Sequence, residues 1–178
     1  GRESRHWLIG LQLNEKRHLM DYKKKKSSLG FTLPQPPKPV ATYVPVVKTG
    51  NLLFLSGMLP FVEGNLIFTG KLGKEITVEQ GQKAARTALL NALAVIKAES
   101  GSLDRIQKIV RLGVHVSSMP DFTQQPAVAN GASDLLAQVF GEVGRHARLA
   151  LGAPVLPFDA SIELEMIVEI SGPGPASK

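Results

Sequence analysis

The chain contains no cysteine among its 178 residues. This absence excludes a disulfide scaffold, a zinc or iron–sulfur centre held by cysteine, and a thiol nucleophile. It also fits a reducing compartment, and we expect a cytoplasmic protein. No apolar run approaches the roughly 20 residues that a membrane-spanning helix needs. We therefore expect a protein without a membrane partner.

The familiar catalytic motifs are also absent. The sequence has no Gly-rich phosphate loop, no His-Glu-x-x-His zinc helix and no nucleophile elbow. Two of the four histidines lie near the N-terminus, which leaves His115 and His146 for the rest of the chain. Two separate histidines without a matching carboxylate spacing make a poor metal site. We expect neither a metal nor another cofactor.

The basic charge of the chain is concentrated at its N-terminus. The net charge is +6, but residues 1–30 hold eight basic and three acidic side chains, against thirteen and twelve in the remainder. The run of lysines at residues 23–26 is either a solvated tail or a contact site for RNA or an acidic membrane. The nearly neutral remainder argues against nucleic acid as a partner, apart from weak binding through the basic N-terminal segment.

A cluster of prolines marks a boundary in the chain. Four prolines between Pro34 and Pro39 require extended backbone. We predict a basic arm over residues 1–37, one globular domain over residues 38–171, and a loose tail over residues 172–178. The basic residues of the arm are loosely similar to a mitochondrial transit peptide, although two glutamates argue against one. A mitochondrial location is thus the alternative to the cytoplasm.

Strands and helices can be assigned from the apolar period. Residues 43–47 and 52–56 flank a turn and predict a hairpin, and a third short strand is expected over residues 66–69. Thr77, with Gln80 in the capping-box position, predicts the start of a helix that ends at Gly101. A second helix is predicted to carry an apolar stripe over residues 128–140 and to end at Gly141.

The remaining segments have a period of two, which is typical of strands. The residues expected to face the core in the first long strand are Ile106, Val110, Leu112, Val114 and Val116. Two further strands are predicted over residues 145–151 and 160–170. This order of elements predicts an α+β domain with one mixed sheet and two helices on one face of it.

The last strand carries a row of carboxylates. Ile162, Leu164, Met166, Val168 and Ile170 alternate with Glu163, Glu165, Ile167 and Glu169. The neighbouring strand is predicted to present Ile109, Arg111, Gly113, His115 and Ser117 on the same face as the glutamates. That face is either solvated or, because it mixes apolar, cationic and glycine residues, a cleft or an interface between copies of the chain.

Several short motifs occur together in a specific order. They are Tyr43-Val44-Pro45, Leu53-Phe54-Leu55-Ser56-Gly57, Leu59-Pro60, residues 82–96, residues 104–116, Asn130, Arg148, Leu156-Pro157 and Ile162-Glu163-Leu164-Glu165. Over roughly residues 38–171 this order resembles the RidA proteins, also called the YjgF or L-PSP family. The Pro-rich lead-in and Gly144-Arg145-His146-Ala147-Arg148 resemble a less characterised branch. The resemblance implies a chorismate-mutase-like fold in a homotrimer, with three ligand clefts between subunits.

The resemblance also implies a reaction and its residues. Active members hydrolyse reactive enamine or imine intermediates derived from amino acids to 2-oxo acids and ammonia. Arg148 would bind the substrate carboxylate, because a guanidinium offers a planar, bidentate match. Glu163 would position or activate the attacking water. The positions that would line the cleft are Tyr43, Ser56, Gly57 and Asn130.

The sequence departs from the family pattern at three positions. Deaminases of this family usually carry two small polar residues after the arginine, whereas this chain has Leu149 and Ala150, and it has Met58 where glutamine often follows Ser-Gly. These departures leave three hypotheses for the function. The first is an imine deaminase acting on a small carboxylate-bearing substrate. The second is a trimer of the same architecture that binds small carboxylates or regulates a partner without catalysis. An endoribonuclease is the third.

Overall fold

The computed structural model describes residues 30–36 and 42–172. The chain divides into two compact units, residues 1–32 and 33–178, and every described helix and strand lies in the second unit. Most of the predicted arm and nearly all of the predicted tail lie outside the described residues, so both stay predictions. Among the described helices, none has the length and apolar character that crossing a membrane would require.

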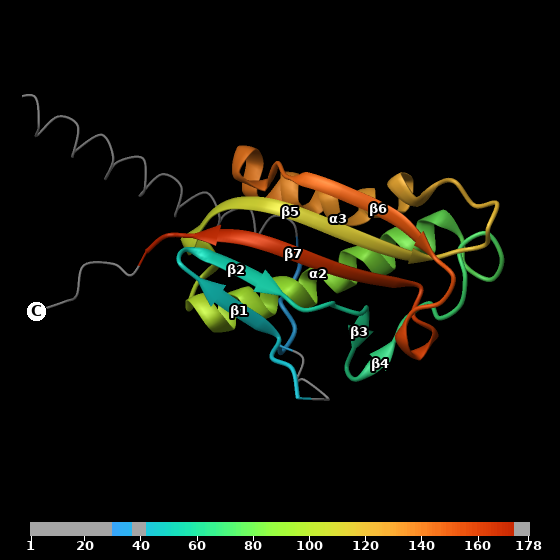
Figure 1. The fold of residues 1–178 in the computed structure, drawn as a ribbon, viewed down its shortest axis with the longest axis horizontal. Coiled ribbons are helices and arrows are strands. Elements are labelled where there is room, and N and C mark those ends of the chain that lie inside the picture. The colour runs from blue at the N-terminus through green and yellow to red at the C-terminus, as the bar shows by residue number, and fades with distance from the viewer. Residues whose placement is uncertain (1–29, 37–41, 173–178) are drawn as a thin grey trace, which may run out of the picture. The chain divides into compact units, whose positions relative to one another are not determined.

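A five-stranded sheet forms the centre of the second unit. Its strands are β1 (Val46–Thr49), β2 (Leu52–Leu55), β5 (Ile106–Ser117), β6 (Ala147–Ala153) and β7 (Ile162–Ile170), in the spatial order β1-β2-β7-β5-β6 (Figure 1). β5 and β6 run parallel and the other neighbours run antiparallel. The predicted mixed sheet is confirmed, and β7, the last of the described strands along the chain, lies at its middle.

A second, two-stranded sheet corrects one prediction. β3 (Phe61–Val62) pairs with β4 (Asn65–Leu66), whereas the sequence predicted a strand over residues 66–69. The strand ends early because Phe68 has a φ of 55°, a left-handed conformation that extended strands do not contain.

Two helices cover one face of the five-stranded sheet (Figure 1). Helix α2 (Val78–Ser100) begins with the predicted capping box: the Gln80 amide donates to Thr77 Oγ1 at 3.2 Å, and the Thr77 amide donates to Gln80 Oε1 at 2.9 Å. It ends at Gly101, whose φ of 83° suits glycine. Helix α3 (Gln125–Phe140) ends at Gly141, as predicted.

The two helices approach each other closely at one glycine. A Cβ atom at Gly131 of α3 would lie 2.1 Å from the backbone oxygen of Gln82 in α2. Only glycine allows this contact, which brings α2 and α3 together as one layer over the sheet. The residues between this layer and the sheet are apolar and fully buried, for example Leu53, Leu89, Leu112, Leu136 and Leu164.

The alternation of β5 differs from the prediction near its start. The register against β7 shifts between Ile106 and Lys108, and again between Ile109 and Arg111. These irregularities bring Ile109 into the core with no exposed surface and leave Val110 only half-buried. The predicted faces of Ile109 and Val110 were therefore wrong, because a bulge resets a period of two. From Leu112 to Val116 the predicted core positions are confirmed.

Candidate functional site

The face of the sheet opposite the helices, called here the outer face, carries the predicted carboxylates. Residues paired on neighbouring strands point to the same face. Glu163 of β7 pairs with His115 of β5, and Glu165 pairs with Gly113. One further row joins Phe54 of β2, Ile167 of β7 and Arg111 of β5. The outer face thus combines charged groups with exposed apolar ones.

Glu163 lies directly against Gly57. The Met58 amide donates to the Leu164 oxygen at 2.7 Å, and the Leu164 amide donates to the Met58 oxygen at 2.9 Å, so the segment after β2 continues along β7. A Cβ atom at Gly57 would lie 2.1 Å from Glu163 Oε1. A side chain at position 57 would displace the Glu163 carboxylate from this position.

Ser56 has a local partner in the same segment. Its hydroxyl donates to the Val44 oxygen at 2.6 Å, and its amide donates to the Pro45 oxygen at 3.0 Å. These bonds hold the segment that leads into β1, where the Tyr43 side chain is half exposed. Ser56, Gly57 and Glu163 therefore form one group on the chain, called here the Glu163 group.

The environment of Glu163 favours its protonated form. Partial burial raises the pKa of its carboxyl group, and the neighbouring negative charge of Glu165 raises it further, while His115 acts in the opposite direction. A carboxyl group with a raised pKa can accept and return a proton closer to neutral pH than an ordinary glutamate can. This property suits a general acid or base.

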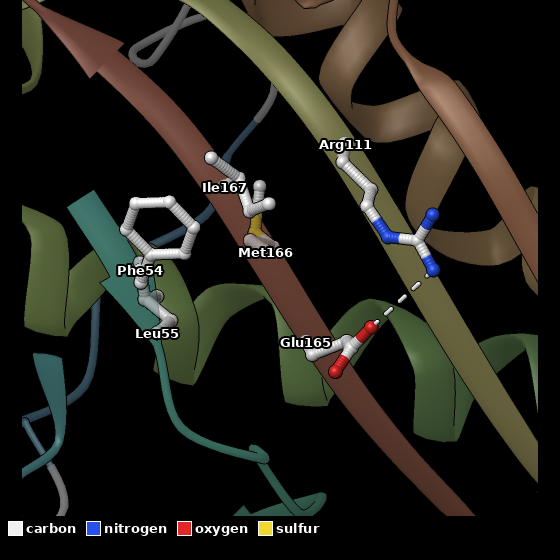
Figure 2. A pocket seen from close by; sticks show the side chains of 6 residues that line it. All are labelled: Phe54, Leu55, Arg111, Glu165, Met166 and Ile167. Carbon is white, nitrogen blue, oxygen red and sulfur yellow. Dashed lines mark ion pairs between the residues drawn. The ribbon is translucent and has the colours of Figure 1, made fainter. Parts of the chain in front are cut away.

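Glu165 occupies a second space left by a glycine. A Cβ atom at Gly113 would lie 2.7 Å from Glu165 Cγ, and Glu165 Oε1 lies 3.7 Å from Arg111 Nη2. Figure 2 shows the Arg111 guanidinium directed toward this carboxylate, with the Phe54 ring on the other side of β7. The lining of this hollow, about 100 Å³ in volume, consists of Phe54, Leu55, Arg111, Glu165, Met166 and Ile167.

Arg148 lies on β6, one of the two edge strands of the five-stranded sheet, and its side chain reaches helix α3. Its pairing with Leu112 places it on the helix-covered side of the sheet. Arg148 Nη1 donates to Asn130 Oδ1 at 2.7 Å and to Ser133 Oγ at 3.2 Å. Asn130 and Ser133 are three residues apart on α3, so both face β6. Asn130, Ser133 and Arg148 form the Arg148 group.

The structure brings some of the predicted site residues together and separates others. Arg148 meets Asn130, and Gly57 meets Glu163. Arg148 and Glu163, however, point to opposite faces of the sheet, and β5 lies between their strands. Within one chain, the predicted site is therefore divided into two groups.

Two residues near Arg148 were not predicted from the sequence as parts of a site. Ser133 Oγ lies 3.0 Å from His146 Nε2, and it also accepts from Arg148. The available signals were the Asn130-x-x-Ser133 spacing on helix α3 and the short His146-x-Arg148 spacing at the entry to β6. Among the described residues, no group of three or more histidine, aspartate or glutamate side chains could hold a metal ion.

The family model described as "YjgF/chorismate_mutase-like, putative endoribonuclease" matches residues 24–170. The chain belongs to the RidA/YjgF/L-PSP family. The observed mixed sheet with two helices on one face is the chorismate-mutase-like fold of this family, as the resemblance implied.

Relatives in the family share most of their length with this chain. Protein TCP17 of Trypanosoma cruzi is 46% identical over 144 residues, which cover 80% of this chain and 90% of TCP17. A 2-iminobutanoate/2-iminopropanoate deaminase of Dermatophagoides farinae is 28% identical over 141 residues, which cover 79% of this chain and 94% of the deaminase. The crystal structure of the protein Atu1372 with unknown function from Agrobacterium tumefaciens matches this chain with a TM-score of 0.81 and 42% sequence identity. The match covers 90% of this chain and 99% of Atu1372.

Proposed function

We propose that the chain hydrolyses enamine or imine intermediates derived from amino acids, giving a 2-oxo acid and ammonia. Membership of the RidA/YjgF/L-PSP family and a relative named as a 2-imino acid deaminase support this reaction. The two groups on the chain have the required chemistry, since one offers a guanidinium and the other a carboxyl group with a raised pKa.

Each group has a distinct role in the proposed reaction. Arg148 binds the substrate carboxylate through its guanidinium, beside Asn130. Glu163 takes a proton from the attacking water and returns it to the departing nitrogen. Ser56 and Gly57 present backbone next to the Glu163 carboxylate, and Tyr43 lines the same end of the cleft.

The observation that carries the proposal is the division of the site within one chain. Because Arg148 and Glu163 point to opposite faces, a cleft containing both requires the Arg148 group of one chain and the Glu163 group of another. Head-to-tail contacts close into a ring when the rotation between neighbouring chains allows it, and the family resemblance implies a ring of three. The proposed homotrimer also covers the outer face, whose exposed apolar side chains include Phe54, Leu149 and Leu151.

The test is complementation between two inactive variants. Arg148→Ala and Glu163→Gln should each reduce ammonia release from enamines generated in situ by about 100-fold or more. When the two chains are co-expressed and form mixed trimers, activity should return to roughly a quarter of the wild-type value, because about one in four neighbouring pairs combines two intact groups.

The controls for this experiment separate assembly from chemistry. Light scattering should give about 57 kDa, three times the chain mass of 19.1 kDa. Arg148→Ala mixed with the double variant Arg148→Ala/Glu163→Gln should recover nothing, because no intact Arg148 group is present. Mixed trimers of the two single variants that stay inactive would contradict a site shared between chains.

A second candidate function is carboxylate binding without turnover. Leu149 and Ala150 replace the two small polar residues that usually follow the arginine, so a donor that could hold the imine or its water is missing. Calorimetry with 2-oxobutyrate, beside the ammonia-release assay, distinguishes the two functions. Binding of 2-oxobutyrate without ammonia release from any of several amino-acid-derived enamines would favour the binding protein. RNA cleavage with neither 2-oxobutyrate binding nor ammonia release would favour an endoribonuclease.

A further inference from the structure

The guanidinium of Arg148 is held on one side only. Its two acceptors, Asn130 Oδ1 and Ser133 Oγ, both bind Nη1. Among the described residues, no acceptor is bonded to Nε or Nη2, and the side chain is exposed. The Nε–Nη2 edge presents two parallel N–H groups and can bind a carboxylate with two hydrogen bonds. The protein thus fixes the guanidinium through Nη1 and leaves the Nε–Nη2 edge available to a ligand.

Behind Arg148, the hydrogen bonds have a defined direction. His146 Nδ1 lies 2.6 Å from the Gly144 carbonyl oxygen, which can only accept, so Nδ1 carries the hydrogen. In the neutral ring Nε2 is then an acceptor, and the Ser133 hydroxyl at 3.0 Å donates to it. With its hydrogen directed to His146, the Ser133 oxygen presents lone pairs to Arg148 Nη1.

The turn before β6 fixes the far end of this chain of bonds. Gly144 ends the 3-10 helix Gly141–Gly144 and is buried against α3, where a Cβ atom would lie 2.2 Å from the Leu136 backbone oxygen. The carbonyl that orients His146 is therefore fixed relative to the helix that carries Ser133. His146 directly precedes β6 and Arg148 is its second residue, and both side chains reach Ser133 Oγ on α3.

We propose that Ser133 and His146 are positioning residues for Arg148: together they hold the guanidinium so that its Nε–Nη2 edge receives the carboxylate of the ligand. The inference rests on the proposed role of Arg148 in binding a 2-oxo acid. An arginine side chain loses considerable rotamer freedom when it is fixed by a ligand. The hydrogen bonds from Arg148 through Ser133 to His146, called here the relay, fix the guanidinium before the ligand binds. Less rotamer freedom is then lost on binding, which raises affinity without adding a contact to the ligand.

The test uses calorimetric titration with 2-oxobutyrate. Ser133→Ala and His146→Phe should each weaken binding roughly 3- to 10-fold, the range expected from one lost hydrogen bond. The double variant should bind no more weakly than either single variant, because the relay fails when either link is broken. Ser133→Thr keeps the hydroxyl and His146→Gln keeps an acceptor near Nε2, so both should retain most of the affinity. Gln138→Ala, on the exposed surface of the same helix, is the matched control.

A further set of variants separates this inference from the proposed function. Arg148→Lys keeps the charge but loses the fork, and it should weaken 2-oxobutyrate binding roughly 30- to 150-fold. In that background Ser133→Ala should have no additional effect, since no guanidinium remains to be positioned. In the enamine assay, the relay variants should raise KM and change kcat little, because Glu163 is unaltered.

Three results would overturn the relay. Wild-type affinity in Ser133→Ala and His146→Phe, together with a weakened Arg148→Lys, would refute it while the proposed function stands. A Ser133→Ala effect of equal size in the Arg148→Lys background would mean a general structural role. Wild-type affinity in folded Arg148→Lys would remove the proposed function itself.

Discussion

The two faces of the five-stranded sheet are built on different rules. The helix-covered face is filled with apolar side chains that have no exposed surface, such as Leu112 and Leu164. The outer face carries carboxylates over glycines: Glu163 lies against Gly57, and Glu165 lies over Gly113. On the helix-covered face the side chains fill the available space. On the outer face Gly57 and Gly113 leave space that the side chains of Glu163 and Glu165 occupy.

This difference separates the requirements of the fold from those of the proposed chemistry. The covered face needs volume and apolar surface, which many combinations of side chains can provide. The outer face needs particular atoms in particular places, and Gly57 and Gly113 leave the space that the Glu163 and Glu165 side chains occupy. Substitutions on the first face should therefore change stability, and substitutions on the second should change activity or assembly.

The largest expected effect comes from the covered face. Leu164→Ala should lower the free energy of unfolding by about 2–5 kcal/mol, because it removes a fully buried side chain and leaves a cavity. Leu149→Ala, on the outer face, should change it by less than about 1 kcal/mol and instead weaken the trimer. Denaturant titration and light scattering measure the two quantities. A larger unfolding effect at Leu149 than at Leu164 would break the comparison.

An intermediate effect is expected at the glycines of the outer face. In Gly57→Ala the new methyl group would lie 2.1 Å from Glu163 Oε1, so the carboxylate must move. Ammonia release should fall roughly 10- to 100-fold, the cost of displacing a catalytic group by about 1 Å. Gly113→Ala displaces Glu165 instead and is the matched control, with kcat near the wild-type value. Equal losses in both variants would show that the face responds as a whole.

The smallest expected effect is a pH dependence of stability. The folded chain raises the pKa of Glu163 above its ordinary value of 4.5, so the folded state binds this proton more tightly than the unfolded state. Stability then falls as the pH rises from about 4.5 through the higher folded pKa, and it is constant beyond that.

The matched variant for this effect is Glu163→Gln. It removes the titration, so its Tm should exceed that of the wild type by at most a few degrees at pH 7, and this excess should shrink toward pH 4. Thermal melts across this range provide the measurement. An excess that grows toward pH 4 would mean that the ionised carboxylate is the form favoured by folding.

Much of the fold could be predicted because its signals are local. The Thr77–Gln80 capping box and the glycines at 101 and 141 set the helix ends, and the alternation along β7 separates Leu164 from Glu163. The bulge near Ile109 could not be predicted, because a register shift depends on the partner strand and leaves the sequence pattern nearly unchanged.

The arrangement of the candidate site was harder to predict from the sequence than the fold. Arg148-Leu149-Ala150-Leu151 has no clear alternation, and only the pairing of β6 with β5 shows that Arg148 faces the helices. The contact between Ser133 and His146 depends on the turn at Gly144, which brings β6 back along α3. Both facts arise from contacts between segments that are distant in sequence.

The strand order has a consequence for the time course of synthesis. β7 lies between β2 and β5 but follows both in the sequence and is the last of the described strands to be made, so both neighbours leave the ribosome with an unpaired edge. The sheet can close only after Ile170 has emerged, and contacts between such distant segments form slowly. Glu163 thus reaches its position last, beside Gly57 and His115 that were made before it. During this interval the unpaired edges of β2 and β5 make the incomplete sheet prone to aggregation.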